Sequence, residues 1–98
     1  MTAEELIEKC LEFLADKDVP QSKRLSAAEK IKKLFAPNAK VKILNQDGDV
    51  VVNTRNAAAY IDIISTSRIL LKVTYVDVDF NDNGQITLLK VKEFYRKN

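Results

Sequence analysis

The sequence predicts a single α+β domain, spanning residues 1–98, in which helices pack on one face of an antiparallel sheet. The chain has 98 residues, the length of one domain. Two segments with helical periodicity precede the first strand-like segment, and two Asx-Gly dipeptides each lie between runs rich in β-branched residues. Hairpins join neighbouring antiparallel strands. The predicted order is therefore helix, helix, strand, strand, helix, strand, strand.

The first two helices are predicted from their start and stop signals. Thr2 and Glu5 form a capping box, and the first helix runs to about Asp16. The second follows Pro20 and ends at Pro37, because proline cannot continue the hydrogen-bond ladder. The residues of the second helix expected to point inward are Leu25, Ala28, Ile31, Leu34 and Phe35. Those expected to face solvent are Lys23, Arg24, Glu29, Lys30, Lys32 and Lys33.

The remaining elements are two hairpins around a third helix. The first hairpin, KVKILNQDGDVVV, turns at Asp47-Gly48, and Thr54 is predicted to cap the helix that follows. On this helix we expect Tyr60 to lie inward and the neighbouring Asp62 to be exposed. The helix ends in the polar residues 65–67, and the second hairpin completes the chain.

The second hairpin contains DVDFNDNGQI, which resembles a calcium-binding loop. From Asp79 the match to an EF-hand loop continues to Ile86, but the twelfth position is Lys90, where the closing carboxylate is required. Both flanks are strand-like rather than helical. Asn83-Gly84 is a preferred dipeptide for tight hairpin turns. We therefore predict a hairpin and no metal site.

Composition excludes several classes of catalytic and cofactor site. The chain has no histidine, so Cys-His and Ser-His-Asp constellations and histidine-based metal sites cannot form. With two glycines it has no glycine-rich phosphate loop. Its one cysteine, Cys10, lies on the apolar stripe of the first helix, where a buried thiol is expected. We predict no cofactor, and no catalytic residue can be identified.

The charge pattern gives little sign of a polyanionic partner. Sixteen Lys and Arg residues oppose 14 Asp and Glu residues, for a net charge of +2. Seven of the cations lie between Lys23 and Lys42, but no aromatic residue is expected on their surface to stack on bases, since Phe35 is expected to point inward. Nucleic-acid binding is therefore predicted to be unlikely. The absence of a long apolar run and of a signal peptide leads us to expect no membrane partner and a cytoplasmic location.

Three segments resemble the nuclear transport factor 2-like superfamily. They are LFAPNAKVKI, TRNAAAYIDII and DFNDNGQITLLKVKEFY, which are distributed between residues 34 and 95. The resemblance implies a curved antiparallel sheet wrapped by helices into a cone, usually with an internal pocket and often with a dimer packed through the sheet. This chain would be a short member, lacking about one hairpin, given strands of roughly 5–6 residues.

The resemblance does not extend to the chemistry of ketosteroid-isomerase-like members. The positions of their tyrosine and two carboxylic acids fall on Cys10, Ile43 and Val76, none of which can replace them. Together with Tyr60, these residues are the candidates for lining a pocket. We therefore predict a non-catalytic module that binds a small apolar ligand or another protein. The alternative is a small pocket enzyme of the isomerase, dehydratase or cyclase type.

The long strands also lead to a prediction about assembly. Both carry apolar residues at odd and even positions, whereas a sheet covered on one face should alternate between apolar and polar residues. Three helices can cover one face, and a two-fold partner is the simplest cover for the other. We therefore predict a homodimer through the sheet. The interface residues would be Val73, Tyr75, Leu89 and Val91.

Overall fold

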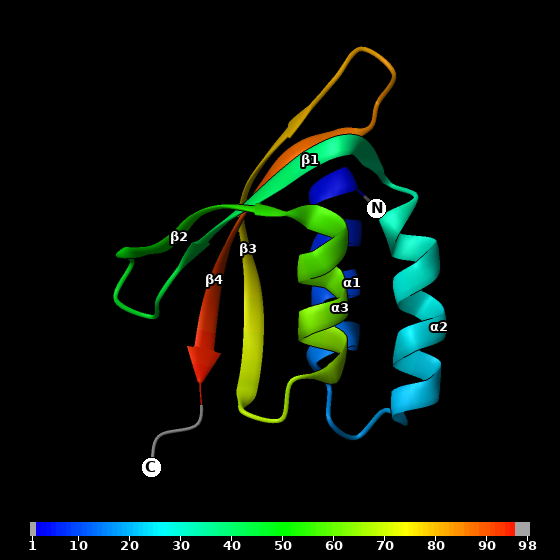
Figure 1. Cartoon of the computed structure of the whole chain (residues 1–98), viewed down its shortest axis with the longest axis vertical. Coiled ribbons are helices and arrows are strands. Elements are labelled where there is room, and N and C mark those ends of the chain that lie inside the picture. The colour runs from blue at the N-terminus through cyan, green and yellow to red at the C-terminus, as the bar shows by residue number, and fades with distance from the viewer. Residues whose placement is uncertain (1, 96–98) are drawn as a thin grey trace.

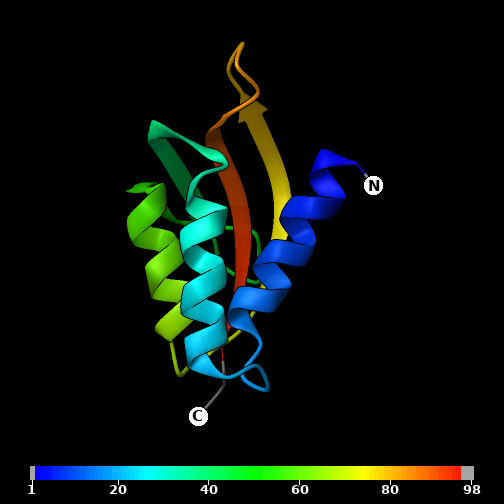
Figure 2. The ribbon, with the colours of Figure 1, turned by 90° about the vertical axis from the view of Figure 1, so that its right-hand side faces the viewer.

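The computed structural model, which describes residues 2–95, contains three helices and a four-stranded sheet (Figure 1). All three helices lie on one side of the sheet (Figures 1 and 2). The α+β class predicted from the sequence is confirmed. In chain order the elements are α1 (Ala3–Ala15), α2 (Gln21–Lys32), β1 (Phe35–Leu44), β2 (Val50–Asn56), α3 (Ala57–Thr66), β3 (Leu70–Phe80) and β4 (Ile86–Tyr95).

The sheet is mixed rather than antiparallel throughout. Its strand order is β2-β1-β4-β3. The pairs β1–β2 and β3–β4 are antiparallel, but β1 and β4 run parallel, with Val41 opposite Leu89. The antiparallel prediction was wrong at this central pair, because a hairpin fixes only the direction of the two strands that it joins. β1 and β4 are separated in sequence by β2, α3 and β3.

Both predicted hairpin turns are present and share one construction. Gly84 has φ +78°, and its N–H donates to the carbonyl of Asn81 over 3.0 Å. Asn81 Oδ1 accepts the backbone N–H groups of Asn83 and Gln85, over 2.9 and 3.0 Å. In the first hairpin Gly48 has φ +91° and Asn45 has the role of Asn81. The calcium-like loop is thus a hairpin turn between two strands.

Several helix boundaries differ from those predicted from the sequence. Thr2 does cap α1, accepting the N–H of Glu5 over 3.1 Å. α2 ends at Lys32, not at Pro37, and Pro37 lies inside β1. The cap of α3 is Asn56 rather than Thr54, because β2 continues to Asn56, whose side chain accepts the N–H of Ala59.

β-Bulges explain the mixed apolar pattern of β3. Its pairing with β4 shifts between Leu70 and Lys72 and again between Tyr75 and Asp77. Each bulge inserts one extra residue into β3. Beyond each bulge the core-facing residues therefore change from even-numbered to odd-numbered positions, or the reverse. The bulged positions hold Leu71 and Val76, which are 53% and 41% exposed. The residues of β3 that face the core are Leu70, Val73, Tyr75 and Val78.

The predicted dimer face is therefore wrong in its residues. Val73, Leu89 and Val91 are fully buried in the core, and Tyr75 packs against it. Side chains that are already covered by the chain's own helices cannot need a partner to cover them. The homodimer itself stays a prediction, without the surface from which it was inferred.

Candidate functional site

A buried polar cluster joins α3 to β4. The carboxylate of Glu93 is 5% exposed and accepts a hydrogen bond from the hydroxyl of Tyr60 over 2.7 Å, with Tyr60 fully buried. Tyr95 is 43% exposed, and its hydroxyl donates to the other carboxylate oxygen of Glu93. Two phenol donors thus stabilise a carboxylate inside the core, where an unpaired one would be costly.

The cluster makes both phenols weaker acids. Burial, and secondarily the negative charge of Glu93, raises the pKa of Tyr60 far above its ordinary value. Burial and the hydrogen bond to Glu93 raise the pKa of Tyr95 to about 12. The positive charge of Arg55 opposes both increases in pKa. Both phenols therefore keep their protons at neutral pH and remain donors to Glu93, which favours a structural role over proton transfer.

Glu93 was missed by sequence reasoning, although its position in β4 carried a signal. It shares its parity in this strand with Leu89 and Val91, which are buried. A carboxylate on the buried face of a strand requires hydrogen-bond donors. Tyr60, correctly predicted to lie inward, is one of them. The exposed Asp62 was also correctly predicted, and its carboxylate forms an ion pair of 2.7 Å with Lys32.

Arg24 is a second buried group whose position was predicted wrongly. It was expected to face solvent, yet it is 7% exposed. Its guanidinium donates to the carbonyl of Val19 over 3.0 Å, to that of Ser65 over 3.0 Å and to that of Leu14 over 3.5 Å. Leu14 and Ser65 lie in the last turns of α1 and α3, which contain no basic residue of their own. Arg24 thus places a cation at two helix C-termini, where the helix dipole favours positive charge.

A wide, open apolar groove lies between α1 and α2. The C-terminus of α1 and the N-terminus of α2 lie close together, joined by residues 16–20, and the two helices diverge toward the N-terminus of α1 (Figure 2). The groove has a volume of about 360 Å³. Its lining is Cys10, Phe13, Ala27 and Ile31, with Lys9 and Lys30 beside them. We call it the α1–α2 groove.

The floor of the α1–α2 groove reaches the core. A smaller apolar hollow lies beneath, and Cys10 and Ile31 line both spaces. The small hollow is also lined by Leu11, Ile61 and Leu89. Because Cys10 is half-buried, the surrounding protein raises the pKa of its thiol. The single cysteine is thus placed at the junction between the groove and the interior.

The four residues predicted to line a pocket do not come together. Cys10 lines the α1–α2 groove, whereas Ile43 is buried in the core of the sheet. Tyr60 contacts Glu93 beneath α3. Val76 lies in a bulge of β3 and is 41% exposed. Matching of sequence motifs could not account for the bulge, which changes the direction in which Val76 points.

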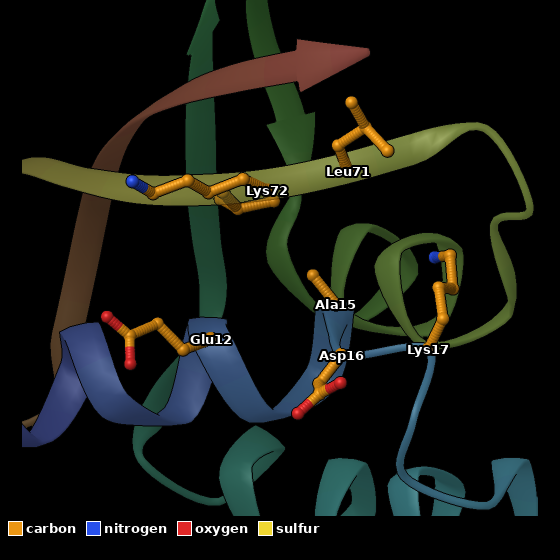
Figure 3. A pocket seen from close by; sticks show the side chains of 7 residues that line it. Glu12, Ala15, Asp16, Lys17, Leu71 and Lys72 are labelled. Carbon is orange, nitrogen blue, oxygen red and sulfur yellow. The ribbon is translucent and has the colours of Figure 1, made fainter. Parts of the chain in front are cut away.

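Another surface pocket lies between the C-terminal half of α1 and the edge strand β3. Its volume is about 300 Å³. Figure 3 shows Glu12 and Asp16 on the α1 side, across from Leu71 and Lys72 of β3. Acidic and basic side chains are mixed around it, so the pocket has no clear preference for ligands of either charge.

The outer face of the sheet, opposite the helices, is rich in lysine. Lys42 is paired with Lys90 in the register of β1 and β4, and Leu44 is paired with Lys92. These residues alternate with the buried side chains of Val41, Ile43, Leu89 and Val91. Because successive residues of a strand point to opposite faces, the lysines point away from the helices.

The basic cluster predicted between residues 23 and 42 is therefore divided between two sides of the molecule. Lys40 and Lys42 lie on the outer face of the sheet, whereas Lys23 and Lys30 lie on α2. Lys32 is held by Glu29 and Asp62 within the helix layer. Sequence proximity grouped these cations, but the fold instead places Lys40 and Lys42 beside the lysines of β4.

Comparison with known proteins adds no relative. The chain matches no protein-family model, no curated protein and no solved structure. Within residues 2–95, no helix has the length and apolar character needed to cross a membrane.

Proposed function

We propose that this chain is a non-catalytic binding domain of nuclear transport factor 2-like type, and that its ligand is a small apolar molecule with an acidic head group. The observation that supports this most is the α1–α2 groove. Its volume of about 360 Å³ lies near the lower end of the range of about 300–1,000 Å³ typical of small-molecule sites. The α+β class and the placement of the helices on one side of the sheet are compatible with the family resemblance.

The side chains of the groove favour an apolar ligand. Phe13 is 39% exposed, and it lines the groove together with the small side chain of Ala27. Transfer of about five CH₂ groups into such a site, at about 0.8 kcal/mol each, corresponds to a dissociation constant of about 1 mM. A fatty acid of medium chain length matches this chemistry.

The charges at the groove favour an acidic head group. Lys9 of α1 and Lys30 of α2 are both exposed and both line the groove. An ammonium group on each side attracts a carboxylate, with a modest energy because both cations are solvated. The proposal therefore distinguishes between decanoate and decanol, which differ in charge but share one hydrocarbon chain.

A binding role fits the geometry better than the enzyme alternative. The group best suited to acid–base chemistry is Glu93, and both of its carboxylate oxygens already accept hydrogen bonds from Tyr60 and Tyr95. It is 5% exposed, and it does not line the α1–α2 groove. A substrate in the groove would therefore not reach it.

Alkylation of Cys10 tests the proposal, because it is the only cysteine and it lines the groove. We expect millimolar decanoate to slow the reaction of Cys10 with iodoacetamide at least about threefold, by occupying the site of reaction. Decanol should protect less, and Lys9→Gln with Lys30→Gln should remove the difference between the two.

A matched pair of variants completes the test. Ala27→Leu fills the groove and should abolish protection by decanoate, whereas Ala58→Leu adds the same volume at an exposed position of α3 and should leave it intact. Equal protection in both variants, or none in the unmodified protein, would reject the groove as the binding site.

A further inference from the structure

The fold gathers five lysines from three strands that are far apart in sequence. Lys40 and Lys42 belong to β1, and Lys90 and Lys92 to β4. Lys72 of β3 borders the pocket beside α1, but it is paired with Phe94 and its ammonium group lies over that ring. We call these five lysines the outer lysine face. We propose that the outer lysine face binds single-stranded nucleic acid. It lies on the side of the sheet opposite the α1–α2 groove, so this inference does not depend on the function proposed above.

The positive charge of this face is only partly neutralised within the chain, by Asp77 and Asp79, which line one hollow with Lys42 and Lys90. In the part of the chain that the structure describes, the ion pairs involve Lys32 and none of the five lysines. Asp77 and Asp79 lie on β3 near the turn, with Asp77 opposite Lys90. Five lysines and two aspartates leave a net charge of +3 on the face. Clustered like charges repel one another, and a bound polyanion would relieve that repulsion.

The arrangement of the cations favours a nucleic acid over a single small anion. Lys42 and Lys90 are neighbours across β1 and β4, while Lys92 is two residues farther along the same strand. The lysines therefore extend across the sheet and along it, over a distance that one phosphate cannot span. A chain of phosphates can contact several of them together, with release of its counterions.

An aromatic ring beside the lysines favours a single strand over a duplex. Phe94 of β4 is partly exposed, and Lys72 Nζ lies 5.8 Å from the centroid of its ring. The ammonium group lies over the ring, so a base can stack on Phe94 only when Lys72 moves aside, where it can hold the phosphate of the same nucleotide. Unstacked bases are accessible in single strands, and sheet surfaces with exposed aromatic residues recognise them in this way.

Fluorescence anisotropy of a labelled oligodeoxythymidine of about 12 nucleotides tests the inference, since this length suits a sheet-sized site. At 50 mM salt we expect saturable binding. If about four phosphates are contacted, the slope of log K against log salt should be about −3, so affinity should fall roughly 50-fold by 200 mM salt.

Charge reversal on the two sides of the molecule supplies the control. Lys42→Glu with Lys90→Glu should weaken binding at least about tenfold and make the salt slope shallower, because two phosphate contacts are lost. Lys23→Glu with Lys33→Glu changes the net charge by the same amount on the helix side and should leave the affinity within about twofold. Phe94→Leu should weaken binding at unchanged salt slope, because stacking releases no counterions.

Four outcomes would overturn the inference. One is no binding of the oligonucleotide at 50 mM salt. Another is an equal loss of affinity in the two charge-reversed variants, which would indicate attraction by net charge alone. A third is unchanged affinity in Phe94→Leu, which would show that no base stacks on the ring and would overturn the assignment of a single strand as the ligand. The last is binding of vesicles that contain phosphatidylserine without binding of the oligonucleotide, which would identify a membrane surface instead. Circular dichroism melting of each variant ensures that a loss of binding does not arise from unfolding.

Discussion

The two faces of the sheet have opposite properties although they are formed by the same strands. On β4 the buried residues Leu89 and Val91 alternate with Leu88, Lys90 and Lys92, which are only partly buried. The inner face supplies the core against which the helices pack, and the outer face carries charge. This contrast teaches that stability and recognition can be assigned to different faces of one strand, and it can be tested residue by residue.

The largest expected difference is between two adjacent leucines of β4. Leu89→Ala removes a fully buried side chain and should lower the free energy of unfolding by about 2–5 kcal/mol, since it leaves a cavity in the core. Leu88→Ala deletes the same atoms on the outer face and should cost less than about 1.5 kcal/mol. Urea denaturation followed by circular dichroism measures both. Equal losses would break the distinction between the faces.

Arg24 provides a sharper test of the inner, helix-covered side. Arg24→Gln should lower the free energy of unfolding by about 2–3 kcal/mol, because the carbonyls of Leu14 and Ser65 lose a charged donor inside the protein. Lys23→Gln removes a neighbouring exposed cation and should change stability by less than about 0.5 kcal/mol. If thermal unfolding showed the same midpoint for both variants, the role assigned to the buried guanidinium would be wrong.

A smaller effect is expected at high pH, from the hydroxyl of Tyr95. Its pKa rises to about 12 in the folded protein, against about 10 for an unperturbed tyrosine. Because the folded state retains the proton more strongly, the stabilisation is fully present below about pH 10 and is lost as the pH rises toward 12. Tyr95→Phe should therefore be less stable than the unmodified protein at pH 8, by an amount that diminishes above pH 10. A constant difference between pH 8 and pH 12 would contradict this linkage.

Local features of the fold could be predicted from the sequence because short-range chemistry decides them. Asn83-Gly84 and Asp47-Gly48 specified their turns through positive φ at the glycines, and Thr2 specified the start of α1. The inward position of Tyr60 followed from helical spacing.

Features that depend on contacts between distant segments could not be predicted in this way. The parallel pairing of β1 and β4 brings together residues about fifty positions apart, and the bulges of β3 arise from its pairing with β4. Arginine is usually exposed to solvent, so nothing in the sequence indicated that Arg24 would be buried. Its acceptors are carbonyl groups of α1 and α3, which only the folded chain brings close to it. The α1–α2 groove likewise depends on the angle between two helices. Of the residues that line the groove, only Cys10 was predicted to line a pocket, and the groove itself was not predicted.

The separation of binding surfaces between the two sides of the molecule is tested most directly by mapping decanoate on the ¹⁵N-labelled protein with NMR. We predict that chemical-shift changes concentrate in residues 6–14 of α1 and in residues 27–34, at the C-terminal end of α2, because these segments border the groove. Little change is expected at Lys40, Lys42, Lys90 and Lys92. The changes should saturate with a dissociation constant of about 1 mM or below. Shifts concentrated on the outer lysine face, or no saturable shifts at the two helices, would contradict the account.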